Sequence, residues 1–327
     1  MKSAGVGRNI TVWCLSLFFV AALFCALPET GALGQEMPSS VKVHTPGPSI
    51  LSLAFEIAKE EGFYQHEGVG VELVTMATGA GVQALIAGSV DASQILGLTL
   101  RAAINRGAAL KIVMVFNDRP TYRLMARKDI TSFADLKGKI VASSSPGASA
   151  DALLQRLLEK RGLIPRKDLT IVYIGSSNIT HRALVGGSVA AAVLVPPLDA
   201  LAKESGFREL ADFAKEDLGP FIGGGVSVSD KFLRERPDVM ARFLRATWRA
   251  LRVIKTNRKL SVAILSKFMN LPTDVAEKIY DGSVSAFTDY GFGSEEWQSR
   301  LLEFEVGRTD KALVQKTFDF SVVRKLK

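Results

Sequence analysis

The sequence predicts a two-lobed α/β fold in which each lobe is a mainly parallel sheet flanked by helices. Two observations support this prediction. Short apolar runs alternate with stretches of helical periodicity through the first two thirds of the chain, which is the pattern of successive strand–helix–strand units. The same order of elements then starts again, which indicates a second lobe built like the first.

The first series of elements ends near residue 116. Each predicted strand is a short apolar or alternating run, and glycine at 62 and 88 ends two of the helices, since glycine suits the left-handed conformation after a helix. The strands are expected at 41–45, 69–76, 90–96 and 110–116, and the helices at 49–62, 81–87 and 99–106.

The second series of elements repeats this order, and parts of the amino-acid sequence repeat as well. Residues 84–92 (ALIAGSVDA) return at 183–191 (ALVGGSVAA), and residues 45–49 (TPGPS) return at 145–149 (SPGAS). The strands are expected at 139–143, 169–174 and 189–195, and the helices at 132–136, 149–161, 178–185 and 198–204. Both pairs of matching segments are separated by nearly the same number of residues, which favours duplication over chance.

The last third of the chain is mainly helical. In the segment 238–255, apolar residues share one face, whereas Arg242, Arg245, Arg249 and Arg252 share the other. Such a stripe is typical of a solvated helix face, and a docking surface for a membrane partner is the alternative.

We therefore divide the chain into four segments. Residues 1–34 form a signal peptide, 35–127 the first part of lobe 1, and 128–221 lobe 2; residues 222–327 supply a return strand and helices that complete lobe 1. The chain then crosses between the lobes twice, at about 118–128 and 219–228, and the glycines at 223–225 give the second crossing backbone freedom for a hinge.

The leader has the order of a secretory signal. Lys2 and Arg8 precede the apolar stretch 10–27, and Ala32-Leu33-Gly34 supplies small residues for cleavage near Gly34/Gln35. We expect a periplasmic protein. An uncleaved membrane anchor is the rival interpretation, because the apolar stretch is long enough to span a bilayer.

Composition excludes several classes of function. The two cysteines, Cys14 and Cys25, lie in the leader, so the mature chain has no disulfide, thiolate nucleophile or cysteine-bound metal. The three histidines lack metal-ligand spacing, and no catalytic motif is present. The net charge of +8 comes from scattered bases, which suit anionic small molecules better than nucleic acid. We expect no cofactor, no metal and no enzymatic activity.

Small residues at helix starts are the candidate binding groups. Gly79-Ala80-Gly81 fits a dinucleotide-binding fingerprint, but it follows the second strand, and Arg101 stands where that motif needs an acid. The turns at 46–49 and 143–149 offer hydroxyls and backbone N–H groups at helix starts, where the helix dipole attracts anions. In parallel sheets these turns lie beyond the carboxyl ends of the strands, where ligands bind.

These turns, together with the segments 62–64, 88–92, 135–139 and 236–237, resemble periplasmic substrate-binding proteins of ABC importers. The similarity is to the branch that binds sulfonates, nitrate and thiamine-pyrimidine precursors. It implies a type II periplasmic-binding-protein fold, a monomer that closes on a small solute, and an ABC permease as partner. One departure is Ala190, where the first lobe and commonly the family have aspartate (Asp91).

The resemblance also implies which residues line the cleft. Carried over by position, they are Gly47, Pro48, Ser49, Thr78, Gly79, Ala80, Thr99, Asn117, Ser145, Gly147, Ala148, Ser149, Pro196 and Pro197. The expected solute is a small anionic or polar organic molecule. Two other functions remain open: an enzyme like the thiamine-pyrimidine synthases, whose cysteine-rich segment this chain lacks, and a receptor that feeds a membrane sensor.

Overall fold

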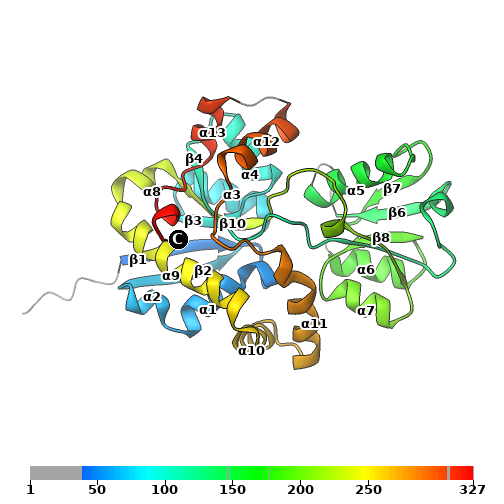
Figure 1. Ribbon diagram of the computed structural model, residues 1–327, viewed down its shortest axis with the longest axis horizontal. Coiled ribbons are helices and arrows are strands. Elements are labelled where there is room, and N and C mark those ends of the chain that lie inside the picture. The colour runs from blue at the N-terminus through cyan, green and yellow to red at the C-terminus, as the bar shows by residue number, and fades with distance from the viewer. Residues whose placement is uncertain (1–38, 145, 147, 176, 308–309, 327) are drawn as a thin grey trace, which may run out of the picture. The chain divides into compact units, whose positions relative to one another are not determined.

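Two five-stranded sheets organise the computed structural model, which describes residues 39–144, 146, 148–175, 177–307 and 310–326 (Figure 1). The predicted signal peptide, Ser145 and Gly147 lie outside the described residues. Within the described ranges, no helix combines the length and the hydrophobicity that a membrane crossing requires.

The first sheet is mainly parallel, as predicted. Its strands lie in the order β2 (Val69–Thr75), β1 (Ser39–Thr45), β3 (Ala92–Ile95), β10 (Gly224–Ser229) and β4 (Leu110–Val115). β1 pairs in parallel with β2 and β3, whereas β10 runs antiparallel to both β3 and β4. The predicted return strand is therefore inserted inside the first sheet.

The second sheet has the equivalent order of strands. They are β7 (Thr170–Tyr173), β6 (Ile140–Ser143), β8 (Ala191–Leu194), β5 (Arg123–Ala126) and β9 (Arg208–Asp212). β6 pairs in parallel with β7 and β8, and β5 runs antiparallel to β8 and β9, as β10 does in the first sheet. Each sheet thus contains, as its antiparallel strand, the strand that follows a crossing: β5 in the second sheet and β10 in the first. The two sheets therefore have the same topology, which agrees with the sequence repeat.

The predicted boundary after residue 127 is corrected by this pairing. We expected the first crossing at about 118–128, but β5 within that segment is hydrogen-bonded into the second sheet. The first crossing therefore lies between β4 and β5, and the second lies between β9 and β10. β9 had no predicted counterpart, because its letters RELAD lack the apolar run that marks a strand.

Helices cover both sheets. They are α1 (Leu53–Glu60), α2 (Phe63–His66), α3 (Thr78–Ala87), α4 (Leu98–Asn105), α5 (Ser149–Lys160), α6 (Ser177–Val185), α7 (Leu198–Glu204), α8 (Asp230–Glu235), α9 (Pro237–Thr256), α10 (Arg258–Met269), α11 (Thr273–Ser283), α12 (Glu295–Val306) and α13 (Lys311–Thr317). Short 3₁₀ helices occupy Ile50–Ser52, Phe133–Leu136, Phe213–Lys215, Val284–Ala286 and Val323–Leu326. In Figure 1 the second sheet, in green, has α5 on one face and α6 and α7 on the other.

The cores follow this layering. On the first sheet, Val41 and Val43 of β1 belong to the same buried cluster as Phe55 of α1 and Phe243 of α9, whose rings stack 6.3 Å apart. α5 and the strands beneath it form a second cluster, and α6 and α7 pack over a third. The C-terminal helices α9–α12 thus belong to the core of the first sheet.

The arginine stripe of α9 is partly exposed, as its pattern predicted, and it also contacts a neighbouring segment. Arg242 donates to the carbonyl of Gly68 over 3.3 Å, and Arg245 pairs with the Glu67 carboxylate at 2.9 Å. Arg249 stacks 4.4 Å from the centre of the Phe63 ring. These arginines attach α9 to the segment around α2. The distribution of apolar residues on α9 does not predict this contact.

Gly81 of α3 is small because a buried imidazole needs the space. The His44 ring is fully buried; its Nδ1 lies 2.8 Å from the Ser93 hydroxyl, and its Nε2 lies 3.1 Å from the Met76 carbonyl oxygen. A Cβ on Gly81 would come within 1.9 Å of the His44 Cε1 atom. The glycine therefore serves close packing of helix on strand rather than close approach of a ligand.

We predict that Gly81→Ala lowers the free energy of unfolding by about 1–3 kcal/mol, since the added methyl overpacks a rigid site. Gly79→Ala is the matched control in the same helix, because no atom lies within 4 Å of its Cβ position. It should leave stability unchanged or raise it slightly. Urea unfolding of both variants measures the difference; equal effects would show that His44 is not the constraint.

Candidate functional site

A cavity of about 560 Å³ lies where the strand ends of both sheets meet. Its lining residues come from the loops and helix starts that follow all six parallel-paired strands, and from both crossing segments. They are Pro46, Thr78, Ile95, Gly97, Leu98, Thr99, Tyr122, Ser144, Ala148, Ser149, Ala150, Gly175, Ser177, Thr180, Val193, Val195 and Gly223. Cavities of this size hold small organic ligands.

Three helices begin at this cavity without a side-chain cap. The N-cap residues of α3, α4 and α5 are Ala77, Gly97 and Ala148, and none of them has a side chain that accepts a hydrogen bond from its helix. The side chains of Ser229, Asn257, Ser294 and Asp310 cap α8, α10, α12 and α13, whereas α1, α2, α7, α9 and α11 also begin without a side-chain cap. The first-turn N–H groups that face the cavity therefore lack side-chain acceptors, which makes them available to a ligand.

The cavity combines apolar surface with hydroxyl groups and has no charged lining side chain among the described residues. Hydroxyl-bearing residues line it from both sheets, and no Asp, Glu, Lys, Arg or His is among the described lining residues. Its electrostatics come from the helix starts, each equivalent to about half a positive charge. Such a surface favours an anion or a strongly polar group.

Ser149 lies where the two sheets approach each other. It is the first residue of α5, and its hydroxyl caps no helix because Ala148 occupies the N-cap position. A Cβ on Gly97, the N-cap residue of α4, would lie 3.7 Å from the Ser149 Oγ atom. The starts of α4 and α5 thus lie next to each other at the cavity.

Tyr122 contributes from the first crossing segment. Its ring packs edge-on against Phe213 and Phe221, with centroids 6.2 Å apart in both cases. Burial among these rings raises the pKa of the Tyr122 phenol to about 12. The phenol therefore stays neutral at physiological pH.

The structure brings together part of the predicted site. Thr78, Thr99, Ala148 and Ser149 line the cavity, whereas Gly47, Pro48, Ser49, Gly79, Ala80, Asn117, Pro196 and Pro197 are not among its lining residues. Ser145 and Gly147 lie outside the described residues. Gly47 adjoins the lining residue Pro46, and the Ser49 hydroxyl lies 3.3 Å from that of Ser52.

Asn117 has a structural role in the crossing. Its side chain is buried; Oδ1 accepts from the Gly224 N–H at 2.7 Å, and Nδ2 donates to the Arg119 carbonyl at 3.1 Å. The Gly223 N–H also donates to the Asn117 carbonyl at 3.1 Å. Asn117 therefore ties the first crossing segment to the second, and its polar groups point at backbone.

Sequence reasoning missed several lining residues. Gly175, Ser177 and Thr180 follow β7, and Val195 follows β8. The rule that ligands gather beyond the carboxyl ends of parallel strands, applied to every strand, would have included them. Tyr122 and Gly223 carry no such signal, since they precede the two antiparallel strands.

The histidines form no metal site. Burial lowers the pKa of His44 and also that of His181 on α6, so both favour the neutral form. Neither lines the cavity, and the described residues contain no group of three or more His, Cys, Asp or Glu that could hold a metal ion.

Comparison with known proteins shows a matching family and a relative of similar length. A family model described as NMT1/THI5 like matches residues 52–258. The Bacillus subtilis protein named "Putative binding protein YtlA" is 22% identical over 291 residues, which cover 85% of this chain and 86% of that protein.

Solved structures agree on the fold. The periplasmic aliphatic sulphonate binding protein SsuA from Escherichia coli has a TM-score of 0.67 at 22% identity, covering 85% of this chain and 91% of its own. The periplasmic nitrate-binding protein NrtA from Synechocystis PCC 6803 has a TM-score of 0.67 at 17% sequence identity, and the match covers 88% of each chain. The desulfurization enzyme DSZB has a TM-score of 0.64 at 15% sequence identity, and the match covers 88% of this chain and 98% of DSZB. The two sheets thus form the two-lobed fold of periplasmic binding proteins.

We predict that Asn117→Ala lowers the free energy of unfolding by about 1–3 kcal/mol, because it leaves the buried Gly224 N–H without its acceptor. Asn105→Ala, at the exposed end of α4, is the control and should change stability by less than about 0.5 kcal/mol. Urea unfolding compares the two variants. A loss of solute affinity with unchanged stability would instead place Asn117 in the binding surface.

Proposed function

The chain belongs to the NMT1/THI5-like family, and we propose that it is an exported solute-binding protein, a monomer that captures a small anionic or polar organic solute and delivers it to an ABC permease. The observation that carries this proposal is the cavity at which uncapped helix starts from both sheets converge. The sulphonate-binding and nitrate-binding proteins that share the fold bind anions, which suits the same electrostatics.

The chemistry of the cavity favours binding over catalysis. General acid–base catalysis needs a titratable group positioned against the substrate. The described lining residues offer hydroxyls and backbone amides, and the only titratable side chain among them is Tyr122, whose pKa is raised. The DSZB likeness shows that an enzyme can have this fold; the lining residues favour the binding function.

We further propose that the solute closes the two lobes about their crossing segments. Tyr122 and Gly223 line the cavity at the two crossings, so a bound solute contacts both lobes and both connections. A ligand that touches both lobes binds the closed state more tightly, and this difference in affinity drives closure. The Asn117–Gly224 hydrogen bond couples the two crossing segments, so that they move together.

A thermal-shift screen tests the function. Organic sulfonates, carboxylates and nitrate are added to the purified protein, and a solute at about 100 times its Kd should add about 2.7 kcal/mol of stability. If no member of the panel raises the Tm, the proposed function is contradicted.

We predict that Ser149→Ala weakens binding of the best solute about 10- to 100-fold, since a hydrogen bond to a charged group contributes about 1.5–3 kcal/mol. Stability should stay unchanged because Ser149 caps no helix. Ser229→Ala is the matched control: Ser229 accepts from the Phe232 N–H at 3.1 Å, so its loss should cost stability and leave affinity unchanged. Titration calorimetry and urea unfolding separate the two effects.

A further inference from the structure

We propose that the solute carries an uncharged apolar group, a short alkyl chain or a single ring, behind its anionic or polar group. This inference rests on the proposed function, because the helix starts at the main cavity hold the anionic or polar group. The place of the apolar group is a smaller cavity that adjoins the main one.

The smaller cavity has a volume of about 190 Å³ and shares Leu98 and Ser149 with the main cavity. Apart from Ser149 and Arg156, its lining residues are all apolar, with Leu153 and Phe221 among them. An engineered cavity of about 150 Å³ with a lining of Leu, Ile and Phe takes up benzene. The volume and the lining therefore suit an alkyl chain of a few carbons or one ring.

The two cavities meet at the starts of α4 and α5. Ser149, the first residue of α5, lines both cavities, and so does Leu98, the first residue of α4. A Cβ on Gly97 would lie 3.7 Å from the Ser149 Oγ atom, so the glycine keeps the two helix starts close together. A solute bound to the N–H groups of these helix starts can therefore place its apolar group in the smaller cavity.

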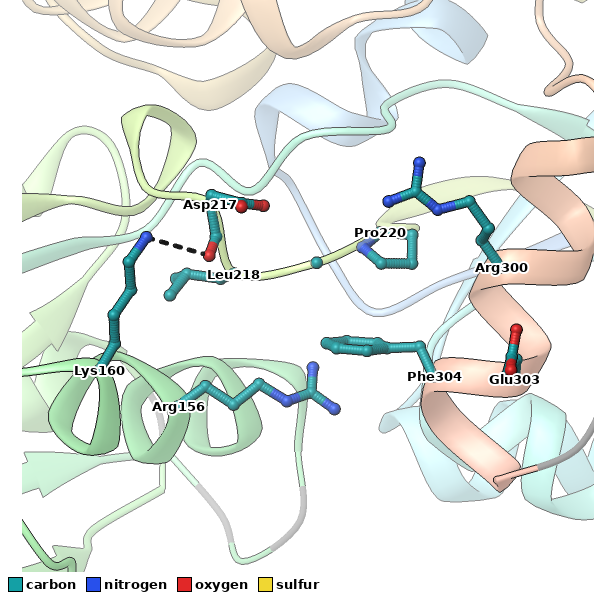
Figure 2. A pocket seen from close by; sticks show the side chains of 9 residues that line it. Arg156, Lys160, Asp217, Leu218, Pro220, Arg300, Glu303 and Phe304 are labelled. Atoms are coloured by element: carbon teal, nitrogen blue, oxygen red, sulfur yellow. Dashed lines mark hydrogen bonds between the residues drawn. The ribbon is translucent and has the colours of Figure 1, made fainter.

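Arg156 and Phe304 line the smaller cavity from α5 and α12. The Arg156 guanidinium lies 3.3 Å from the centre of the Phe304 ring, a cation–π contact. Figure 2 shows Arg156 extending from α5 toward this ring, with Pro220 of the second crossing segment nearby. The guanidinium is thus engaged with the protein itself.

The surroundings give no preference for a second charge on the solute. The surface beyond Arg156 and Phe304 carries charges of both signs, from Lys160 and Arg300 and from Asp217 and Glu303. A charged group in the smaller cavity would exchange water for aliphatic and aromatic side chains, which is costly. An uncharged apolar group gains by leaving water in the same place.

The apolar group would contact both lobes and the segment that joins them. Leu153 on α5 belongs to the core of the second lobe, whereas Leu98 on α4 and Phe304 on α12 belong to elements of the first. Phe221 and Ile222 belong to the second crossing segment. Burial of the apolar group therefore adds to the difference in affinity that favours the closed state.

Series of anions with lengthening alkyl chains test the inference by titration calorimetry at constant pH and ionic strength. The sulfonates are ethanesulfonate, butane-1-sulfonate and hexane-1-sulfonate, and the carboxylates are propanoate, pentanoate and heptanoate. In at least one series, each buried methylene should tighten binding about fourfold until the cavity is full. The first step, which adds two methylenes, should therefore gain about tenfold. The heat-capacity change of binding should become more negative along the series, as apolar burial requires.

Hydroxyl analogues of equal length separate an apolar subsite from a merely roomy one. 3-Hydroxypropane-1-sulfonate replaces the terminal methyl of butane-1-sulfonate, and 4-hydroxybutanoate replaces that of pentanoate. Each should bind about tenfold more weakly than its methyl counterpart, because the hydroxyl loses its hydrogen bonds with water.

Ala152→Leu identifies the cavity that holds the apolar group. Ala152 lines the smaller cavity and not the main one, so a leucine there fills the space. The gain with chain length should disappear, while the affinity for ethanesulfonate or propanoate changes less than about twofold. Ala152→Val fills less of the space and should remove part of the gain, which keeps the test decisive if the leucine variant does not fold. Ala312→Leu, on the exposed surface of α13, is the matched control and should keep the full gain.

Two kinds of outcome would overturn the inference, and they are distinguishable. If affinity does not rise with chain length, if the hydroxyl analogues bind as tightly, if the gain survives substitution of Ala152, or if nitrate binds and neither series does, the apolar subsite is wrong and the proposed function stands. If no member of either series binds and nitrate is also inactive in the thermal-shift screen, the proposed function fails together with the inference.

Discussion

The parallel direction of six strands is the constraint on which the binding site depends. β1, β2 and β3 end at one edge of the first sheet, and β6, β7 and β8 end at one edge of the second. Every one of these strand ends supplies a residue to the same cavity. Parallel pairing thus gathers the starts of several helices around one cavity, and neither sheet alone completes its lining.

The helix starts at the cavity lack the side-chain caps that four other helices of the chain have, as do the starts of α1, α2, α7, α9 and α11. A capping side chain contributes about 0.5–2 kcal/mol, and α8, α10, α12 and α13 have one. α3, α4 and α5 do not, and their N-cap positions hold Ala77, Gly97 and Ala148. Local features that lower stability are expected at functional sites. Under the proposed function, the solute supplies acceptors for these backbone N–H groups.

The two-lobed class was predictable because its signals are local: apolar runs, helix stops and the repeat at 84–92 and 183–191 indicated two α/β lobes. The strand-end rule pointed to the turn at Ser149, whereas Thr78 was expected only from the family resemblance; both line the cavity. What could not be predicted depends on contacts between distant residues. The pairing of β5 with β8 and β9 gave Tyr122, just before β5, its place at the cavity, and Asn117 bonds to a residue 107 positions away.

The Gly79-Ala80-Gly81 motif also shows the difference between what local sequence predicts and what depends on distant contacts. The Gly79-Ala80-Gly81 motif correctly marked a helix start after a strand. The reason for Gly81, however, is the buried His44 ring on the neighbouring strand, which the motif does not contain. A small residue at a helix start can allow close approach of a ligand or close packing of a side chain. The fold is needed to distinguish the two.

The central claim is that one solute contacts both lobes and closes them. Small-angle scattering of the protein without solute and at saturation with the tightest solute tests it most directly, combined with hydrogen exchange to map the contacts. The account predicts a smaller radius of gyration at saturation and protection at the starts of both α4 and α5. An unchanged radius, with protection confined to one lobe, would contradict it.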